Sequence, residues 1–416
     1  MKTIFRFLSI AVVFAGLGAS AAFAQDACAD VEGQTASYTK VTDNYASKEV
    51  ANLKIALASG KEFLEKYGAC AALKDQIDFV KPQVARLEKA IPDMEGRAAL
   101  GQLFTRFDAG IKGEKYDEAY AAGREILAKQ PDNLNILIPL GQIGLYQSYT
   151  KNYKYNDDTL RYAQEALKVL KSGKELPKKN KAGVPVAGAF QFECAKEDCI
   201  NDLNYAIGYI NFYAKENKKA ALPYYYEVSQ SAKYKTDPRV YATIGSYYID
   251  DASKLGQEIA GLIAKQKAAA TDDEKVALDT EIKAKVALFN GYAERSLDAY
   301  SRAYKSAKED TPAAKTYKEG LYKILQDIYK RRYDKLDGLD AYVSSTIAKP
   351  LPNPTSEVTP VTDPEPAKTT SSTAPATTTA PVAAAPATVK PTASTAAAAK
   401  PATAPAKKTV AVKKNR

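Results

Sequence analysis

Apolar and polar positions alternate with the period of an α-helix through residues 25–349. Apolar side chains recur three and four residues apart over residues 55–67 and again over residues 73–91, which places them on one face of a helix. Alternating β-rich runs bounded by turn pairs are missing. The pattern predicts an all-α protein made of antiparallel helix pairs.

Capping residues predict three helix starts. Asp237-Pro238 and Thr311-Pro312 each place a capping side chain before a proline, and residues 271–274 read Thr-Asp-Asp-Glu. An Asp or Thr side chain caps the first amide groups of a helix, proline suits the first helical position, and Thr-x-x-Glu forms a capping box. We expect helices to begin at these three places.

One short block recurs along the chain. Leu100-Gly101-Gln102 is repeated as Leu140-Gly141-Gln142, and Ile207-Gly208 and Ile244-Gly245 are related to it. Glycine inside a helix costs about 1 kcal/mol relative to alanine, so it usually serves to let a neighbouring helix approach closely. We expect close helix packing at these four glycines.

The same region resembles the tetratricopeptide-repeat family. Tyr116-Asp117-Glu118-Ala119, Pro131-Asp132-Asn133 and Leu140-Gly141 fall at the spacing of that family, and Ala220 follows Gly208 by twelve residues. The resemblance implies a helical solenoid with Ala119 and Ala220 as further packing positions. The period is not kept, because Gly141 and Gly208 are 67 residues apart and Gly208 and Gly245 are 37 apart, against about 34 in the family.

The expected domain organisation follows from these patterns. Residues 25–95 do not match the repeats and form an N-terminal helical segment, and residues 96–349 form the degenerate tetratricopeptide-like domain. Residues 252–308 suggest helices longer than those of the family, with a projecting hairpin.

First helices of such pairs line the curved inner surface of a solenoid, which makes these folds binding platforms. Tyr205, Tyr209 and Tyr213 are four residues apart and share one face of a helix. Two interpretations stay open: a tyrosine-lined groove for an extended peptide, or ordinary core between helices. The groove candidates, taken opposite the packing glycines, are Asn135, Gln142, Tyr146, Asp202, Tyr205, Tyr209, Phe212, Tyr213, Arg239 and Ser246.

The N-terminus and the cysteines predict an exported protein. Lys2 and Arg6 precede an uncharged apolar run, and residues 22–24 read Ala-Phe-Ala, typical of a signal peptide cleaved after residue 24; the alternative is a membrane anchor. No later segment reaches the roughly 18 apolar residues of a spanning helix.

Export favours oxidised cysteines. We expect Cys28 to pair with Cys70 and Cys194 with Cys199, in preference to a four-thiolate metal site.

Composition changes sharply at Pro350. Residues 350–416 hold 12 of the 21 prolines and no aromatic residue, so we expect a disordered tail. Its end is basic, and five side chains are candidate contacts to anionic envelope polymers: Lys407, Lys408, Lys413, Lys414 and Arg416. The attraction would depend on salt and read no nucleic-acid sequence; a spacer or a glycosylated segment is the alternative. Without tail and signal peptide, the formal charge of +10 shrinks to +3 for residues 25–349.

The chain contains no histidine. Every mechanism that needs an imidazole is therefore excluded, including Ser-His-Asp catalysis and His-ligated zinc, and no phosphate-binding or dinucleotide motif is present. We expect a non-enzymatic binding or scaffold protein of the cell envelope, with a protein or peptide partner and no cofactor. The alternative is a structural protein that binds anionic cell-wall or surface polymers through its tail.

Overall fold

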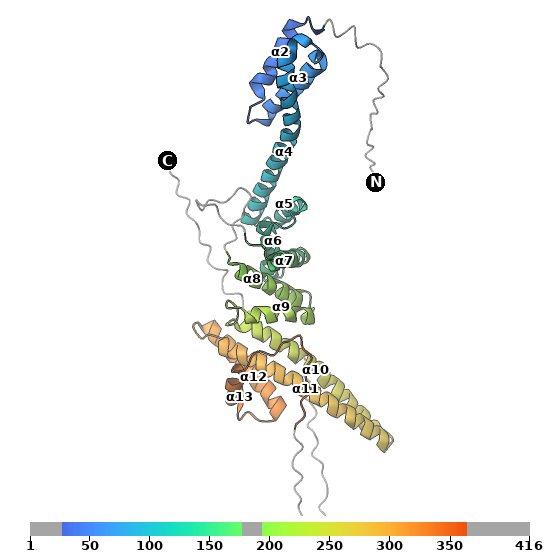
Figure 1. Cartoon of the computed structure of the whole chain (residues 1–416). Coiled ribbons are helices and arrows are strands. Elements are labelled where there is room, and N and C mark those ends of the chain that lie inside the picture. The colour runs from blue at the N-terminus through green and yellow to red at the C-terminus, as the bar shows by residue number, and fades with distance from the viewer. Residues whose placement is uncertain (1–26, 177–193, 364–416) are drawn as a thin grey trace, which may run out of the picture. The chain divides into compact units, whose positions relative to one another are not determined.

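The computed structural model describes residues 27–176 and 194–363. Every regular element in these two ranges is a helix, as the hydrophobic pattern predicts. Contacts divide the chain into two compact units, Met1–Gly113 and Glu114–Arg416, and each is a set of helices packed on their neighbours (Figure 1). The predicted signal peptide, residues 177–193 and residues 364–416 lie outside the described residues.

The first unit contains α2 (Val31–Asn44), α3 (Val50–Tyr67), the short 3₁₀ helix η1 (Ala71–Leu73) and α4 (Lys74–Lys112). Val41, Phe63 and Val80 are fully buried where α2, α3 and α4 meet. Cys28 and Cys70 form the expected disulfide, which ties the start of the unit to the end of α3. The expected boundary at residue 95 falls inside α4, which continues without a break to Lys112.

The second unit begins with α5 (Tyr116–Lys129) and continues as three antiparallel helix pairs. These are α6 (Leu134–Ser148) with α7 (Asn156–Lys171), α8 (Lys196–Tyr209) with α9 (Lys218–Gln230), and α10 (Pro238–Ala268) with α11 (Asp272–Ser306). A π-helical turn, η2 (Ile210–Ala214), follows α8 directly, and α12 (Pro312–Tyr333) and α13 (Leu339–Ile347) close the unit.

The predicted helix starts are confirmed. The side chain of Asp237 accepts a hydrogen bond from the backbone N–H of Arg239 at the start of α10. The side chain of Thr311 accepts one from the backbone N–H of Ala314 at the start of α12. Thr271 and Glu274 form the capping box that opens α11. With 31 and 35 residues, α10 and α11 are the predicted long helices, and their hairpin extends past the other helices of this unit (Figure 1).

Residues 351–363, which we name the C-terminal strap, correct the prediction of disorder from Pro350. Leu351 and Val358 pack against buried side chains of the second unit, and Pro354 is itself buried. The prediction was wrong here because a segment that cannot form its own core can still use apolar surface supplied by finished helices. The expected polyanion contacts of the tail, from Lys407 to Arg416, lie outside the described residues.

Candidate functional site

Close helix packing at glycine is confirmed in all three helix pairs. A Cβ atom on Gly141 would lie 2.9 Å from the Cα of Ala163 in α7, and one on Gly245 would lie 2.6 Å from the ring of Tyr300 in α11. On Gly208 it would lie 3.2 Å from the ring of Tyr225 in α9. Each first helix therefore turns its glycine toward its second helix, as the repeated block predicts.

The expected packing role is wrong for Gly101 and shifted by one residue for Ala220. Gly101 is exposed in α4, and a Cβ atom there would meet nothing within 4 Å. Ala119 is fully buried as expected, whereas on α9 Ala220 is only half-buried and its neighbour Ala221 is fully buried. The same tripeptide, Leu-Gly-Gln, is therefore exposed around Gly101 and packed against another helix at Gly141.

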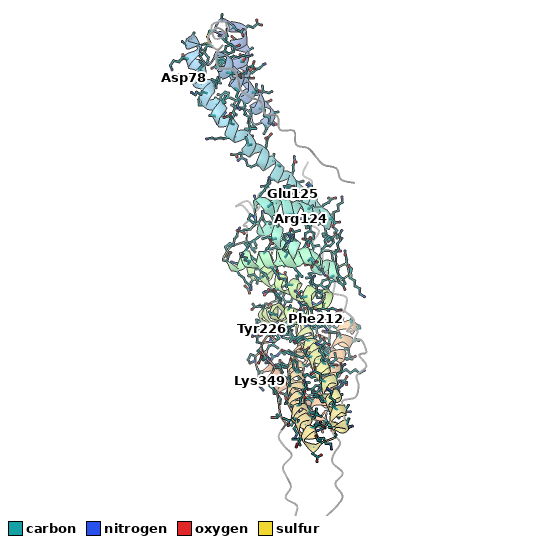
Figure 2. All side chains as sticks on the ribbon, turned by 90° about the vertical axis from the view of Figure 1, so that its right-hand side faces the viewer. Asp78, Arg124, Glu125, Phe212, Tyr226 and Lys349 are labelled. Carbon is teal, nitrogen blue, oxygen red and sulfur yellow. A yellow bond between two sulfur atoms is a disulfide. The ribbon has the colours of Figure 1, made fainter. Side chains whose placement is uncertain are left out.

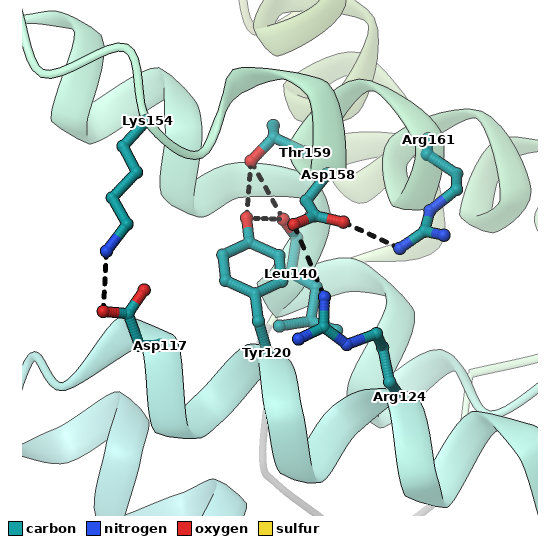
Figure 3. Close-up of polar contacts among 8 residues, drawn as sticks. All are labelled: Asp117, Tyr120, Arg124, Leu140, Lys154, Asp158, Thr159 and Arg161. Atoms are coloured by element: carbon teal, nitrogen blue, oxygen red, sulfur yellow. Dashed lines mark hydrogen bonds and ion pairs between the residues drawn. The ribbon is translucent and has the colours of Figure 1, made fainter. Parts of the chain in front are cut away.

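A buried polar contact joins α5, α6 and α7 (Figure 3). The hydroxyl of Thr159 donates to the carbonyl of Leu140 and accepts from the backbone N–H of Gly144 at 2.7 Å. The hydroxyl of Tyr120 also donates to the Leu140 carbonyl. Thr159 therefore inserts between two backbone groups of α6 that are four residues apart, and a side chain at Gly144 would strike it. This contact fixes the position of α6.

Five tyrosines form a continuous series of ring contacts across two neighbouring first helices. Ring centroids are 6.3 Å apart for Tyr146 and Tyr149, 5.0 Å for Tyr149 and Tyr209, and 4.8 Å for Tyr209 and Tyr213; Tyr205 is 6.3 Å from Tyr209. These separations suit favourable aromatic pairs. We name the five residues the tyrosine row.

The exposed ends of the tyrosine row distinguish the two interpretations left open by the sequence. Tyr205 is buried, Tyr209 is partly buried, and Tyr146 and Tyr213 are each 50% exposed. Tyr213 lies in the π-helical turn and its hydroxyl shares a hydrogen bond of 2.8 Å with that of Thr243. The row is therefore buried at Tyr205, partly buried at Tyr149 and Tyr209, and accessible at its two ends, Tyr146 and Tyr213.

Charged side chains flank the row on both sides. Asp202 accepts hydrogen bonds from the hydroxyl of Tyr234 and from Lys233, and Tyr234 stacks on Tyr205 at 5.2 Å. Arg239, at the start of α10, binds both carboxylate oxygens of Asp237. Each pair joins one basic and one acidic side chain, so the surface around the tyrosines has no strong charge of one sign.

Burial raises the pKa values of the buried and partly buried phenols of the row. It raises the pKa of Tyr209 to about 12, with a smaller contribution from the neighbouring Tyr213, and it raises the pKa values of Tyr149 and Tyr205 further. The hydrogen bonds from Arg239 to Asp237 raise the pKa of that guanidinium. At neutral pH the row offers apolar ring faces with hydroxyl groups that can donate or accept a hydrogen bond.

Other predicted groove residues lie apart from the row or beneath the surface. Gln142 and Phe212 are buried, and Phe212 packs on Tyr225 of α9; Figure 2 labels Phe212 and, on α9, Tyr226. Asn135 is at the first turn of α6, eleven residues or about 16 Å along the axis from Tyr146. Ser246 donates to the carbonyl of Thr243 in its own helix.

Two members of the aromatic surface, Tyr149 and Tyr234, were missing from the predicted site. Tyr149 caps the end of α6, three residues after Tyr146, so its helical spacing was the signal that could have found it. Tyr234 lies between α9 and α10 in a non-helical turn, where periodicity gives no information. Its place is set by its hydrogen bond to Asp202.

The disulfide between Cys194 and Cys199 lies at the start of α8. It joins the residue that enters α8 to the first turn of the helix, upstream of Asp202 and the tyrosine row. The expected pairing is confirmed, and its consequence is that the approach of the chain to this helix is covalently restrained.

No protein-family model, no curated protein and no solved structure matches this chain. In the described ranges no helix is both long and apolar enough to cross a membrane. The fold and the tyrosine row must therefore be interpreted from their own geometry.

Proposed function

We propose that this chain is an exported, non-enzymatic binding protein of the cell envelope, and that the tyrosine row contacts an extended segment of a protein partner. The observation that carries the proposal is the half-exposure of Tyr146 and Tyr213 at the two ends of one continuous aromatic series. Tyrosine is favoured at interfaces because its ring buries a large apolar area while the hydroxyl keeps a polar partner.

The architecture supports a tetratricopeptide-like use of the fold. Three successive pairs each turn a glycine of the first helix toward the second helix, and the row is carried by the first helices α6 and α8 and the turn that follows α8. In stacked helix pairs, first helices line the binding surface. We infer a degenerate solenoid whose irregular spacing comes mainly from the long stretch of sequence between α7 and α8.

Two disulfides and the signal-like residues 1–24 support an oxidising compartment outside the cytoplasm. The absence of histidine from the whole sequence supports a binding role over catalysis. The basic end of the chain gives a second candidate, attraction to anionic envelope polymers, which rests on the segregation of basic residues after residue 366.

Affinity capture from envelope extract tests the proposal. Three full-length proteins are compared: the natural chain, a Tyr146→Ala/Tyr213→Ala double variant, and the control Tyr226→Ala, which removes a half-buried tyrosine from the second helix α9. We expect the double variant to lose the partner and the control to keep it. Because both side chains are half-exposed, the double variant should stay folded, with only a small drop in melting temperature from the lost ring contacts and the lost hydrogen bond to Thr243.

A salt series separates this proposal from polymer binding by the tail. A fourth protein replaces Lys407, Lys408, Lys413, Lys414 and Arg416 by glutamine. Capture that survives this change and moderate salt supports the tyrosine row. Capture that disappears with the basic residues, and collapses as salt rises, supports the tail and contradicts the proposed function.

A further inference from the structure

The C-terminal strap is held in the way that grooves hold peptides. Its backbone is contacted by side chains and by one helix carbonyl: Asn290 donates to the carbonyl of Val361, Arg295 donates to that of Asn353, and the N–H of Val361 donates to the carbonyl of Ala287 at 2.8 Å. Most strap residues are otherwise exposed. Main-chain hydrogen bonds with a few side-chain anchors are typical of extended-peptide recognition.

Gly291 in the middle of α11 provides space for the strap. A Cβ atom there would lie 2.3 Å from the carbonyl oxygen of Thr359 and 2.9 Å from Val358, and all of its nearest neighbours belong to the strap. Since glycine weakens a helix interior, its use at this position is explained by the close approach of the strap.

A buried arginine receives the end of the strap. The side chain of Arg332 in α12 is 3% exposed and lies between Glu294 of α11 and Asp363, the last described residue, with nitrogen–oxygen distances of 2.9 and 2.8 Å. A buried guanidinium requires paired carboxylates. The strap therefore supplies one of the two acids that neutralise Arg332.

Apolar anchors complete the contact. Leu351 packs on two core clusters of the unit, and Val358 packs on the one that includes Tyr248 and Ala299. Arg302 donates to the carbonyl of Lys349 at 2.7 Å, two residues before the strap. Prolines at 352, 354 and 360 favour an extended chain. The occupant is thus defined chemically: an extended, proline-punctuated segment with aliphatic anchors and a carboxylate at its end.

We propose that the surface of α11 and α12 around Gly291 and Arg332 is a peptide-binding groove, filled in this structure by the strap, and that a partner carrying a segment of this chemistry displaces the strap. Few main-chain hydrogen bonds hold the strap and most of its residues are exposed, so a segment with the same anchors can take its place. Covalent attachment gives the strap an effective concentration in the millimolar range, which makes it a competitor that a partner must overcome.

Fluorescence anisotropy with a labelled synthetic peptide of residues 350–363 tests this in the full chain. The natural chain is compared with a strap-weakened chain, Val358→Ala/Asp363→Ala, and with the same chain carrying Gly291→Ala as well. We expect the peptide to bind the strap-weakened chain at least about tenfold more tightly than the natural chain, because competition is reduced. Gly291→Ala should abolish the gain, since alanine suits α11 but blocks the approach of the peptide.

Three results would overturn the proposal. The first is a strap-weakened chain that stays folded and does not bind the peptide, which makes the strap a structural element alone. The second is loss of cooperative unfolding in the strap-weakened chain, which makes the strap part of the core. The third is a labelled natural chain that binds the strap-weakened chain as tightly as the peptide does, which identifies a second copy as the occupant. A peptide with asparagine in place of Asp363 should bind about tenfold more weakly because Arg332 loses a charged acceptor.

Discussion

Gly141→Ala and Gly101→Ala make the same substitution in the same tripeptide, Leu-Gly-Gln, and we expect them to change stability in opposite directions. Both glycines lie inside helices, so alanine improves the intrinsic helix propensity by about 1 kcal/mol in each. The surroundings differ. A Cβ atom at position 101 meets nothing within 4 Å, whereas one at position 141 meets backbone atoms of Ala163 at 2.9 and 3.0 Å and a methyl group of Leu203 at 2.8 Å.

The magnitude follows from these distances. Overpacking a tight helix contact costs about 1–3 kcal/mol, and the upper part of that range applies to Gly141 because the obstructing atoms are backbone atoms, which cannot rotate away. After the gain in propensity, Gly141→Ala should lower the free energy of unfolding of the second unit by about 2 kcal/mol, or its melting temperature by about 4–8 °C. Gly101→Ala should stabilise α4 by up to about 1 kcal/mol.

The assay is urea unfolding followed by circular dichroism, together with hydrogen exchange of peptides from α4 and α6. Exchange should slow in α4 of the Gly101 variant and accelerate in α6 and α7 of the Gly141 variant. A Gly141→Ala protein as stable as the natural chain, or a Gly101→Ala protein destabilised by a similar amount, would refute the reasoning that glycine at 141 serves helix approach.

Two further predictions concern buried polar groups. Thr159→Val should destabilise the second unit by about 1–3 kcal/mol because the buried N–H of Gly144 loses its acceptor, and Thr159→Ser should stay near the natural stability in the same urea titration. Alkaline pH should unfold the unit: burial raises the pKa of Tyr209 to about 12 from 10.0, so its contribution to stability is present below pH 10 and is lost as pH rises through about 12. The tyrosinate absorbance of the buried tyrosines should therefore appear over the same pH range in which the helix content falls. Complete ionisation of all tyrosines near pH 10 with intact helices would contradict this.

The fold class and the helix starts could be predicted because they depend on local physical rules. Asp237, Thr271 and Thr311 cap the helices that follow them, and the four cysteines form the two pairs that the sequence predicts. Capping and periodicity involve residues within a turn or two of each other, so the sequence carries them directly.

The exposure of individual residues could not be predicted in the same way. Tyr205 and Tyr213 share one helical face, yet Tyr205 is buried by Tyr234 and Tyr225 while Tyr213 stays half-exposed. Gly101 and Gly141 each stand between a leucine and a glutamine, yet only Gly141 has another helix packed against it. These outcomes depend on contacts between segments far apart in the chain.

The order of the C-terminal strap could not be predicted from the composition of the strap itself. Its composition, rich in proline and threonine, indicates a segment that cannot fold alone, and that inference concerns the segment in isolation. Gly291, Asn290 and Arg332 prepare a place for it on α11 and α12. Asn290-Gly291 can be read as a turn signal in the sequence, although the structure uses both residues inside a helix.

Photo-crosslinking tests most directly whether the tyrosine row is the binding surface. A photoreactive amino acid replaces Tyr213 in one full-length protein and Tyr226 in another, and both are irradiated in envelope extract after confirmation that they unfold at the natural temperature. We predict a discrete protein adduct from position 213 and none from position 226. Equal labelling from both positions, or an adduct from position 226 alone, would contradict it.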